Sequence, residues 1–357
     1  MSASTQLRRQ RLGAALTDLG VEALLVTTLV NVRYLTGFTG SNGAVLVLAD
    51  GSAVFFTDGR YRDQAAEEVP DLEHVITRDL IGGMAERADV ARLGIESHTL
   101  SVDAHARLRE LLPSTSLTGT GRVVEKLREV KDAEEIDALT RACDISTRAL
   151  AGLLEGPLVG RTEREVARDL ENRMLDLGAE AIAFETILAA GENSAIPHHH
   201  PTDRVLAQGD LLKIDFGARV DGYHADCTRT VVLGTADDWQ REVHAAVKAS
   251  QAAGLDRLRD GVPVSDADTA ARGSLEASGW LEAFTTGLGH GVGLEIHEDP
   301  FVAASHTGKL TSRTVLTMEP GIYVPGRGGV RIEDTVLVTA GAPEVLTTMT
   351  KDLLEIG

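Results

Sequence analysis

KIDFGARVDGYHADCTRT is the sequence of residues 213–230, and its pattern of side chains predicts a β-hairpin. Apolar and polar residues alternate along its first part, with the two-residue period of a strand that has one buried face. The pair Asp221-Gly222 then supplies residues that tolerate positive φ in a tight turn. If the strands fold back about this turn, Asp215 and Asp226 lie close to opposite each other on one face, with Cβ atoms roughly 5 Å apart.

Two carboxylates that face each other in a sheet need a compensating partner. Like charges in that position repel, and burial increases the repulsion, so either a shared proton or a cation must lie between them. A second hairpin is expected over Thr317–Val324 and Val330–Val336. Glu319 and Glu333 are equally far from the middle of its turn and should also oppose each other. Because the same arrangement of carboxylates occurs twice, a cation is the favoured partner.

The two hairpins belong to a loose internal repeat. Each hairpin follows two segments with helical periodicity, which are Ala133–Leu154 and Thr162–Leu177 before the first, and Asp237–Leu258 and Val264–Ser278 before the second. Thr162 and Glu165 have the spacing of a capping box, which marks the start of the second helix.

The N-terminal part of the chain has a different pattern, in which helices and strands alternate. Helices are expected at Thr5–Leu19, Tyr61–Val69 and Val102–Leu112, and strands at Ala23–Val26, Ala44–Leu48, Ala53–Thr57, His74–Thr77 and Arg92–Ile95. The pattern breaks at residues 119–121, after which a charged segment from Arg122 is expected to begin a long helical run. We therefore expect an α/β domain over residues 1–121 and a second domain over residues 122–357.

Composition limits the possible partners and location. The chain has 357 residues, of which 43% are hydrophobic, so it can form two packed domains. Its formal net charge of −19 argues against binding to nucleic acid or to an anionic membrane surface. The absence of an apolar segment long enough to cross a bilayer or to act as a signal peptide predicts a cytoplasmic protein. Cys143 and Cys227 lack metal-site spacing and are expected to be small buried hydrophobic residues.

A glycine-rich segment between the hairpins adds an imidazole to the carboxylates. Residues 287–298 read GLGHGVGLEIHE, and the glycines beside His290 would let the backbone come close to a ligand. Four carboxylates and one imidazole suit Mn²⁺, Fe²⁺, Co²⁺ or Zn²⁺, and the residues concerned are Asp215, Asp226, His290, Glu319 and Glu333.

Charge balance indicates how many metal ions such a site would hold. One divalent cation would leave two buried negative charges uncompensated, each costing several kcal/mol, whereas two divalent cations neutralise all four carboxylates. Two ions about 3.5–4 Å apart would hold a water that loses its proton near neutral pH, which is hydrolytic chemistry.

With KIDFGARVDGYHADCTRT, GLGHGVGLEIHE, TMEPGIYV and GGVRIEDT, the chain resembles the pita-bread metallopeptidases. The likeness is to the bacterial Xaa-Pro peptidases, Xaa-Pro dipeptidase (prolidase) and aminopeptidase P, and it extends to NVRYLTGFTGSNG, TDGRY and SAIPHHHPTDR. It implies a creatinase-like α/β N-terminal domain and an α+β pita-bread catalytic domain. The implied activity is hydrolysis of the bond between an N-terminal residue and proline, in peptides with proline second. The implied cofactors are two divalent ions per subunit, Mn²⁺ or Co²⁺ ahead of Zn²⁺, and the implied assembly is a homodimer.

The resemblance also implies roles for individual residues. The five residues of the predicted metal site match the family's metal ligands, and Glu319 would in addition act as the acid/base. His198 matches a histidine of the active-site loop that contacts substrate, although three histidines follow one another at residues 198–200. His297 would steady the scissile carbonyl, and Arg331 would organise the site and bind substrate.

Three other interpretations share parts of this pattern. Methionine aminopeptidases share the ligand set but usually lack a first domain of this kind. Creatinase has both domains but not the metal ligands, and catalytically inactive pita-bread proteins have lost ligands and serve as interaction modules. The sequence does not distinguish a dipeptidase from aminopeptidase P, and it does not identify the native metal.

Overall fold

The computed structural model describes residues 3–357 and divides into two compact units, between Arg128 and Glu129. We expected the boundary after residue 121, on the other side of helix α6 (Val123–Arg128), which belongs to the first unit. The single helical run expected from Arg122 is wrong. Residues 129–132 separate α6 from the next helix, and in this stretch the Lys131 N–H donates to the Arg313 carbonyl at 3.0 Å.

The first unit is built on a six-stranded mixed sheet in the order β4-β3-β2-β1-β5-β6. Its centre is β1, which is parallel to β5 and antiparallel to β2, and its four residues are all buried because both faces of the sheet are covered. The strands are β1 (Ala23–Val26), β2 (Gly43–Leu48), β3 (Ala53–Thr57), β4 (Glu73–Ile76), β5 (Arg92–Ile95) and β6 (Ser116–Gly119).

The helices of the first unit confirm the predicted alternation. Predicted helices correspond to α1 (Ala3–Asp18), to the short helix η1 (Gly59–Tyr61) followed by α3 (Arg62–Glu68), and to α5 (Val102–Leu111). The sequence analysis missed α2 (Leu29–Thr36), α4 (Leu80–Arg87) and β6, all of them short.

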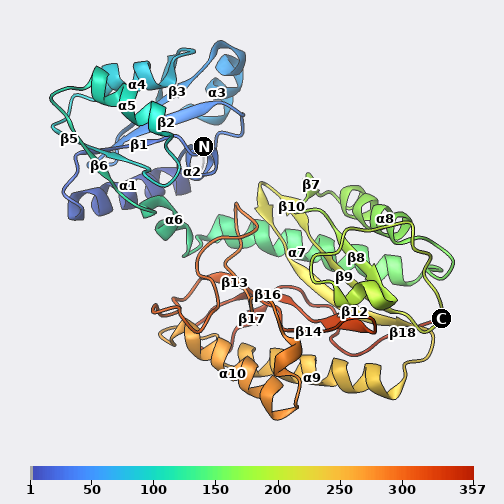
Figure 1. The fold of residues 1–357 in the computed structure, drawn as a ribbon. Helices are drawn as coiled ribbons and strands as arrows, with labels where there is room; N and C mark the ends of the chain where they lie inside the picture. The colour runs from blue at the N-terminus through green and yellow to red at the C-terminus, as the bar shows by residue number, and fades with distance from the viewer. Residues whose placement is uncertain (1–2) are drawn as a thin grey trace. The chain divides into compact units, whose positions relative to one another are not determined.

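The second unit places its strands between two pairs of helices, as Figure 1 shows. The helices are α7 (Ala133–Leu154) with α8 (Glu163–Asp176), and α9 (Asp238–Leu255) with α10 (Val264–Ala277). All four were predicted, and the predicted capping box of Thr162 and Glu165 is present at the start of α8. The strands form short sheets in the orders β11-β10-β7, β18-β12-β9-β8, β13-β16-β17 and β14-β15.

The first hairpin has the predicted turn but a different register. Strand β9 (Leu211–Phe216) pairs with β12 (Cys227–Leu233), and β10 (Ala218–Val220) pairs with β11 (Tyr223–His224). The turn has φ of 50° at Asp221 and 82° at Gly222. The register pairs Asp215 with Thr228, so Asp226 is the diagonal neighbour of Asp215 on the same face and does not lie directly opposite.

The second hairpin consists of two ladders with one register. Strand β13 (Val315–Met318) pairs with β16 (Asp334–Leu337), and β14 (Gly321–Val324) pairs with β15 (Gly328–Arg331). Between the ladders Pro320 has no N–H to donate, which interrupts the pairing. The two flanking ladders nevertheless keep the register that places Glu319 opposite Glu333, as predicted.

The remaining elements of the second unit are short. They are β7 (Ala181–Ile182), β8 (Ile187–Ala190), η2 (Gly191–Ala195), η3 (Leu281–Ala283), β17 (Glu344–Val345) and β18 (Glu355–Ile356).

Apolar packing beneath the second hairpin fixes its orientation. Val247 of α9 and Ala271 of α10 belong to one buried cluster with Met318 and Val330 of the hairpin. Because this face is occupied by the helices, Glu319 and Glu333 lie on the other face of the hairpin. Cys143 and Cys227 are both buried and free, as predicted. Within residues 3–357 we find no helix with the length and apolar character needed to span a membrane.

Candidate metal centre

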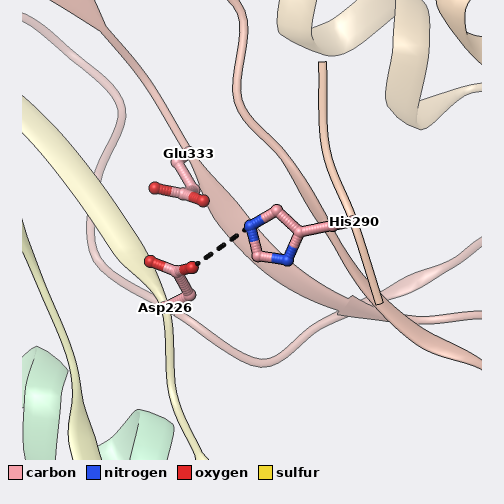
Figure 2. Close-up of side chains that lie close together, drawn as sticks. All are labelled: Asp226, His290 and Glu333. Carbon is pink, nitrogen blue, oxygen red and sulfur yellow. Dashed lines mark ion pairs between the residues drawn. The ribbon is translucent and has the colours of Figure 1, made fainter. Parts of the chain in front are cut away.

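The predicted metal ligands all line one cavity of about 450 Å³ in the second unit. The side chains of Asp226, His290 and Glu333 point toward one another, and each offers a ligand atom within 4.8 Å of the others (Figure 2). The Nε2 atom of His290 lies 3.6 Å from Asp226 Oδ2 and 3.3 Å from Glu319 Oε1. Asp215 and Glu319 complete the lining on the same side.

The backbone around His290 fixes the direction of its imidazole. Nδ1 lies 3.0 Å from the Gly291 carbonyl and donates to it, so Nε2 is the nitrogen that faces the carboxylates and would bind a metal once its own proton is lost. The His290 N–H donates to Thr317 Oγ1 at 3.1 Å. A Cβ on Gly289 would lie 2.1 Å from the Thr317 carbonyl oxygen, so glycine at this position permits the close approach.

The two carboxylate oxygens of Asp215 have different surroundings. One carboxylate oxygen, Oδ2, accepts a hydrogen bond from the guanidinium of Arg331. The other, Oδ1, is buried and has no hydrogen-bond partner among the described residues. A buried carboxylate oxygen without a partner is costly, and a divalent cation would satisfy it. The residues present therefore fit the metal site that the sequence predicts.

The protonation of the carboxylates in the metal-free protein reflects their crowding. Burial, followed by repulsion from Glu333 and Asp215, raises the pKa of Asp226 well above its usual value. Burial and the charges of Glu319 and Asp215 raise the pKa of Glu333 in the same way. For Glu319, burial acts to raise the pKa, but the hydrogen bond and charge of His290, together with the charge of Arg331 and the hydrogen bond from Thr317, outweigh burial and the pKa is lowered.

These shifts predict that the metal-free protein loses stability as pH rises. A carboxyl whose pKa is raised by folding binds more protons in the folded than in the unfolded state, so stability falls with increasing pH above the ordinary carboxyl pKa of about 4. With the metals removed by EDTA, we expect a lower unfolding midpoint at pH 8 than at pH 5, and Mn²⁺ should reverse the loss. Thermal unfolding of the metal-free protein across this pH range checks the prediction. An unfolding midpoint that rises steadily with pH would contradict it.

Two threonines hold the glutamates, and the sequence analysis did not identify them. Thr228 Oγ1 donates to Glu333 Oε2 at 2.6 Å, and Thr317 Oγ1 is 3.3 Å from Glu319 Oε1. Such contacts orient metal-binding carboxylates. The two-residue period of a strand could have identified them. Thr228 lies two residues after Asp226, and Thr317 lies two residues before Glu319, so each threonine is on the same face as that ligand.

Arg331 organises the first hairpin as well as the second. Its buried guanidinium donates to Asp215, to Tyr323 Oη at 2.8 Å and to the Pro197 carbonyl at 3.3 Å. Its Nε donates to Thr228 Oγ1 at 3.0 Å, so Arg331 reaches Glu333 only through Thr228. Its direct carboxylate partner is Asp215.

The three successive histidines have different environments. His199 is buried, with Nε2 2.8 Å from Glu163 Oε2, and His200 lies on the surface, with Nδ1 3.2 Å from Glu185 Oε1. His198 lines the cavity, is exposed and makes no hydrogen bond or ion pair within residues 3–357. Of the three, His198 is thus the one with both ring nitrogens available to a ligand.

His297 lies beside the ligand histidine. The rings of His290 and His297 meet edge to face, with centroids 4.3 Å apart, and His297 lines the cavity. Partial burial and the neighbouring His290 lower the pKa of His297, which favours a neutral imidazole that can donate one hydrogen bond.

The rest of the cavity wall is largely apolar. Phe184, Ile187, Ile296 and Phe301 line it, and the ring of Phe301 lies 6.4 Å from that of His290. A charged centre beside an apolar wall is suited to a small organic substrate with one polar group to be attacked.

Family comparisons agree with this geometry. The chain matches the model of Metallopeptidase family M24 over residues 137–340, and that of the Creatinase/Prolidase N-terminal domain over residues 8–130. The chain therefore belongs to metallopeptidase family M24 and is a peptidase, with a creatinase-type N-terminal domain and a pita-bread catalytic domain. The predicted family and fold class are confirmed.

Individual relatives cover nearly the whole chain. It is 34% identical to an Xaa-Pro dipeptidase of Pyrococcus furiosus, over 97% of this chain and 99% of that protein. The structure of an Xaa-Pro dipeptidase from Bacillus anthracis is similar with a TM-score of 0.93 and 35% identity, covering 98% of this chain and 99% of that one. An X-Pro aminopeptidase from Thermotoga maritima gives a TM-score of 0.90 and 33% identity, with the same coverage.

Proposed function

We propose that this peptidase hydrolyses the bond between an N-terminal residue and a following proline. The observation that carries the proposal is that four carboxylates and His290 line one cavity together with an apolar wall. The relatives support the substrate, since they are named for activity on Xaa-Pro peptides. Two of these names specify a dipeptidase, which favours Xaa-Pro dipeptides as the principal substrate.

The proposed metal ligands are Asp215, Asp226, His290, Glu319 and Glu333. When bound, two divalent ions would act as Lewis acids on the scissile carbonyl and make a water nucleophilic near neutral pH. We propose Mn²⁺ or Co²⁺, with Zn²⁺ as an alternative, because oxygen donors predominate. We also propose that the protein is cytoplasmic, as its sequence predicts, and that it forms a homodimer, as the family resemblance implies.

The protein's own residues would handle the proton and the developing charge. Glu319 has a lowered pKa and is ionised at neutral pH, so it can take a proton from the attacking water and pass it to the proline nitrogen. His297, neutral and on the cavity wall, would donate a hydrogen bond to the carbonyl oxygen as negative charge develops there. Arg331 would act through Asp215, whose carboxylate it holds.

Substrate tests separate this proposal from its rivals. The purified protein, freed of metal and reconstituted with Mn²⁺ or Co²⁺, should cleave Ala-Pro and leave Met-Ala and Ala-Ala intact. Cleavage of Met-Ala in preference to Ala-Pro would indicate methionine aminopeptidase-like activity. If no Xaa-Pro peptide of any length released its N-terminal residue, the proposed function would be wrong.

Replacing His198 should weaken substrate recognition while leaving the metal centre intact. We expect His198→Ala to lower kcat/KM for Ala-Pro by roughly 10–100-fold, because one positioned hydrogen bond to the reacting group contributes about 10²-fold. His200→Ala is the matched control and should change kcat/KM less than about twofold, since His200 is largely exposed at the cavity and its ring already pairs with the exposed Glu185. Equal effects of the two substitutions in steady-state assays would contradict the assignment.

A further inference from the structure

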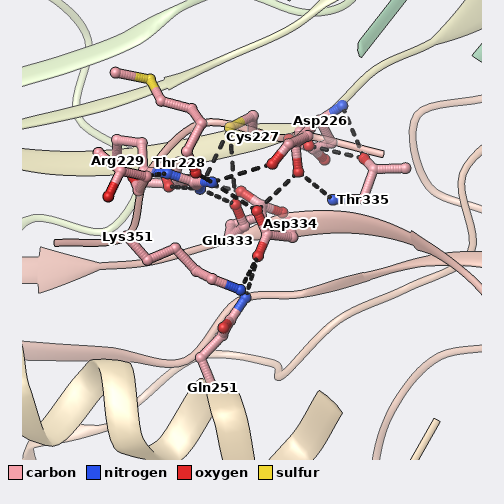
Figure 3. Close-up of polar contacts among 12 residues, drawn as sticks. Asp226, Cys227, Thr228, Arg229, Gln251, Glu333, Asp334, Thr335 and Lys351 are labelled. Carbon is pink, nitrogen blue, oxygen red and sulfur yellow. Dashed lines mark hydrogen bonds and ion pairs between the residues drawn. The ribbon is translucent and has the colours of Figure 1, made fainter. Parts of the chain in front are cut away.

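A buried ion-pair network lies directly behind the ligand Glu333. Its centre is Asp334, the next residue, which is fully buried in the second hairpin. Four donors surround its carboxylate: Arg229 Nη2 at 2.7 Å, Gln251 Nε2 at 2.7 Å, Thr347 Oγ1 at 2.8 Å and Lys351 Nζ at 2.8 Å. Figure 3 shows Asp334 with Arg229, Gln251 and Lys351. A carboxylate with this many donors is held in one position.

Arg229 connects this network to the ligand and to the C-terminal segment. Its Nη1 donates to the backbone carbonyl of Glu333, and its Nη2 pairs with Asp334 at 2.7 Å. The same guanidinium donates to the Met349 carbonyl at 2.8 Å and, through Nε, to the Thr350 carbonyl at 3.0 Å. One side chain therefore joins β12, the ligand and the segment Thr347–Lys351.

The backbone at Glu333 needs this support. Strand β15 ends at Arg331 and β16 begins at Asp334, so Glu333 lies in the gap between the two ladders of the hairpin. Its N–H donates to the Thr228 carbonyl at 3.1 Å, and its carbonyl accepts from Arg229. The side chain of Arg229 thus replaces the hydrogen bond that a continuous ladder would supply.

We propose that Arg229, Asp334 and the C-terminal segment Thr347–Lys351 form a positioning network that sets the affinity of the metal centre through Glu333. The inference rests on the proposed metal site and assigns these residues no contact with substrate. Outer residues that orient a metal ligand typically change metal affinity by about 10–100-fold when they are replaced.

The test measures Mn²⁺ affinity separately from folding. Arg229→Lys keeps the positive charge beside Asp334 but removes the planar fork, so it should weaken Mn²⁺ binding about tenfold in calorimetric titrations of the EDTA-treated protein. Arg241→Lys is the matched control, because Arg241 also contacts the C-terminal region, pairing with Glu355, but half of its side chain is exposed. Arg241→Lys should bind Mn²⁺ like the wild type.

A second matched pair covers the case in which Arg229→Lys does not fold. Lys351→Met removes one donor from buried Asp334, whereas Lys248→Met removes an ion pair with exposed Asp352, the residue that follows the segment. We expect Lys351→Met to weaken Mn²⁺ binding about threefold, a smaller effect because Lys351 reaches the ligand only through Asp334. Lys248→Met should leave the affinity unchanged.

The Mn²⁺ titrations distinguish failure of the positioning network from failure of the proposed metal centre. Weaker Mn²⁺ binding by Arg229→Lys or Lys351→Met, with both controls unchanged, supports the network. Unchanged affinity in these variants, even with a lower unfolding midpoint of the metal-free protein, would show a structural role only and overturn the inference. If the wild type itself bound no Mn²⁺, the proposed metal centre would fail and this inference with it.

Discussion

Asp226→Asn should abolish metal loading and turnover together. The Asp226 carboxylate lies 3.6 Å from His290 Nε2 and lines the same cavity as the other ligands. Asparagine keeps the shape but removes one of the negative charges that two divalent ions would neutralise. Because metal ions contribute several kcal/mol of transition-state stabilisation, kcat/KM for Ala-Pro should fall about 10³-fold or more.

The metal-free form of the variant provides an internal check on folding. Repulsion from Glu333 and Asp215 helps to raise the pKa of Asp226, and asparagine removes this repulsion. Metal-free Asp226→Asn should therefore be at least as stable as the metal-free wild type at pH 8, so loss of activity would not result from unfolding. Metal content by plasma mass spectrometry, activity and thermal unfolding are the three measurements.

A control in the same hairpin isolates the ligand role. Asp221→Asn makes the same chemical change at the turn, where the side chain is exposed and pairs with Arg141. Asparagine tolerates the φ of 50° at this position, so metal content and activity should be unchanged. Normal metal content and turnover in Asp226→Asn would refute the assignment of Asp226 as a ligand.

Local chemistry explains why the hairpins could be predicted from sequence. Alternation and the Asp221-Gly222 turn are properties of adjacent residues, and both are present in the structure. The partner of Asp215 follows from the same turn, because the hairpin keeps one register about Asp221-Gly222 and that register pairs Asp215 with Thr228. The expectation that Asp226 lies close to opposite Asp215 was therefore wrong by two residues in a register that the turn already defines.

Contacts between distant segments could not be predicted in this way. The pairing of Arg331 with Asp215 and that of His199 with Glu163 join residues far apart in sequence. No periodicity encodes such pairs, because they depend on how separate strands and loops pack. The structure therefore adds most where the sequence left a choice, as among the histidines at residues 198–200.

Glu319→Gln should separate proton transfer from metal binding. Glutamine keeps the shape and one carbonyl oxygen as a ligand, but it cannot accept the proton of the attacking water. Glu319 is suited to that role in the wild type, because the hydrogen bond with His290 lowers its pKa despite burial. General base catalysis typically contributes 10²–10⁴-fold, so kcat for Ala-Pro should fall by roughly that factor at saturating Mn²⁺.

The control for this prediction is another glutamate of the same cavity. Glu185 lines the cavity, is largely exposed and pairs with His200, so Glu185→Gln should change kcat less than about twofold. Metal content must be measured for both variants, because a fall in kcat with full Mn²⁺ occupancy would result from impaired proton transfer and not from lost metal. A Glu319→Gln enzyme with full occupancy and kcat within tenfold of the wild type would show that another group moves the proton. The neutral imidazole of His297, on the same wall, would then be the residue to replace next.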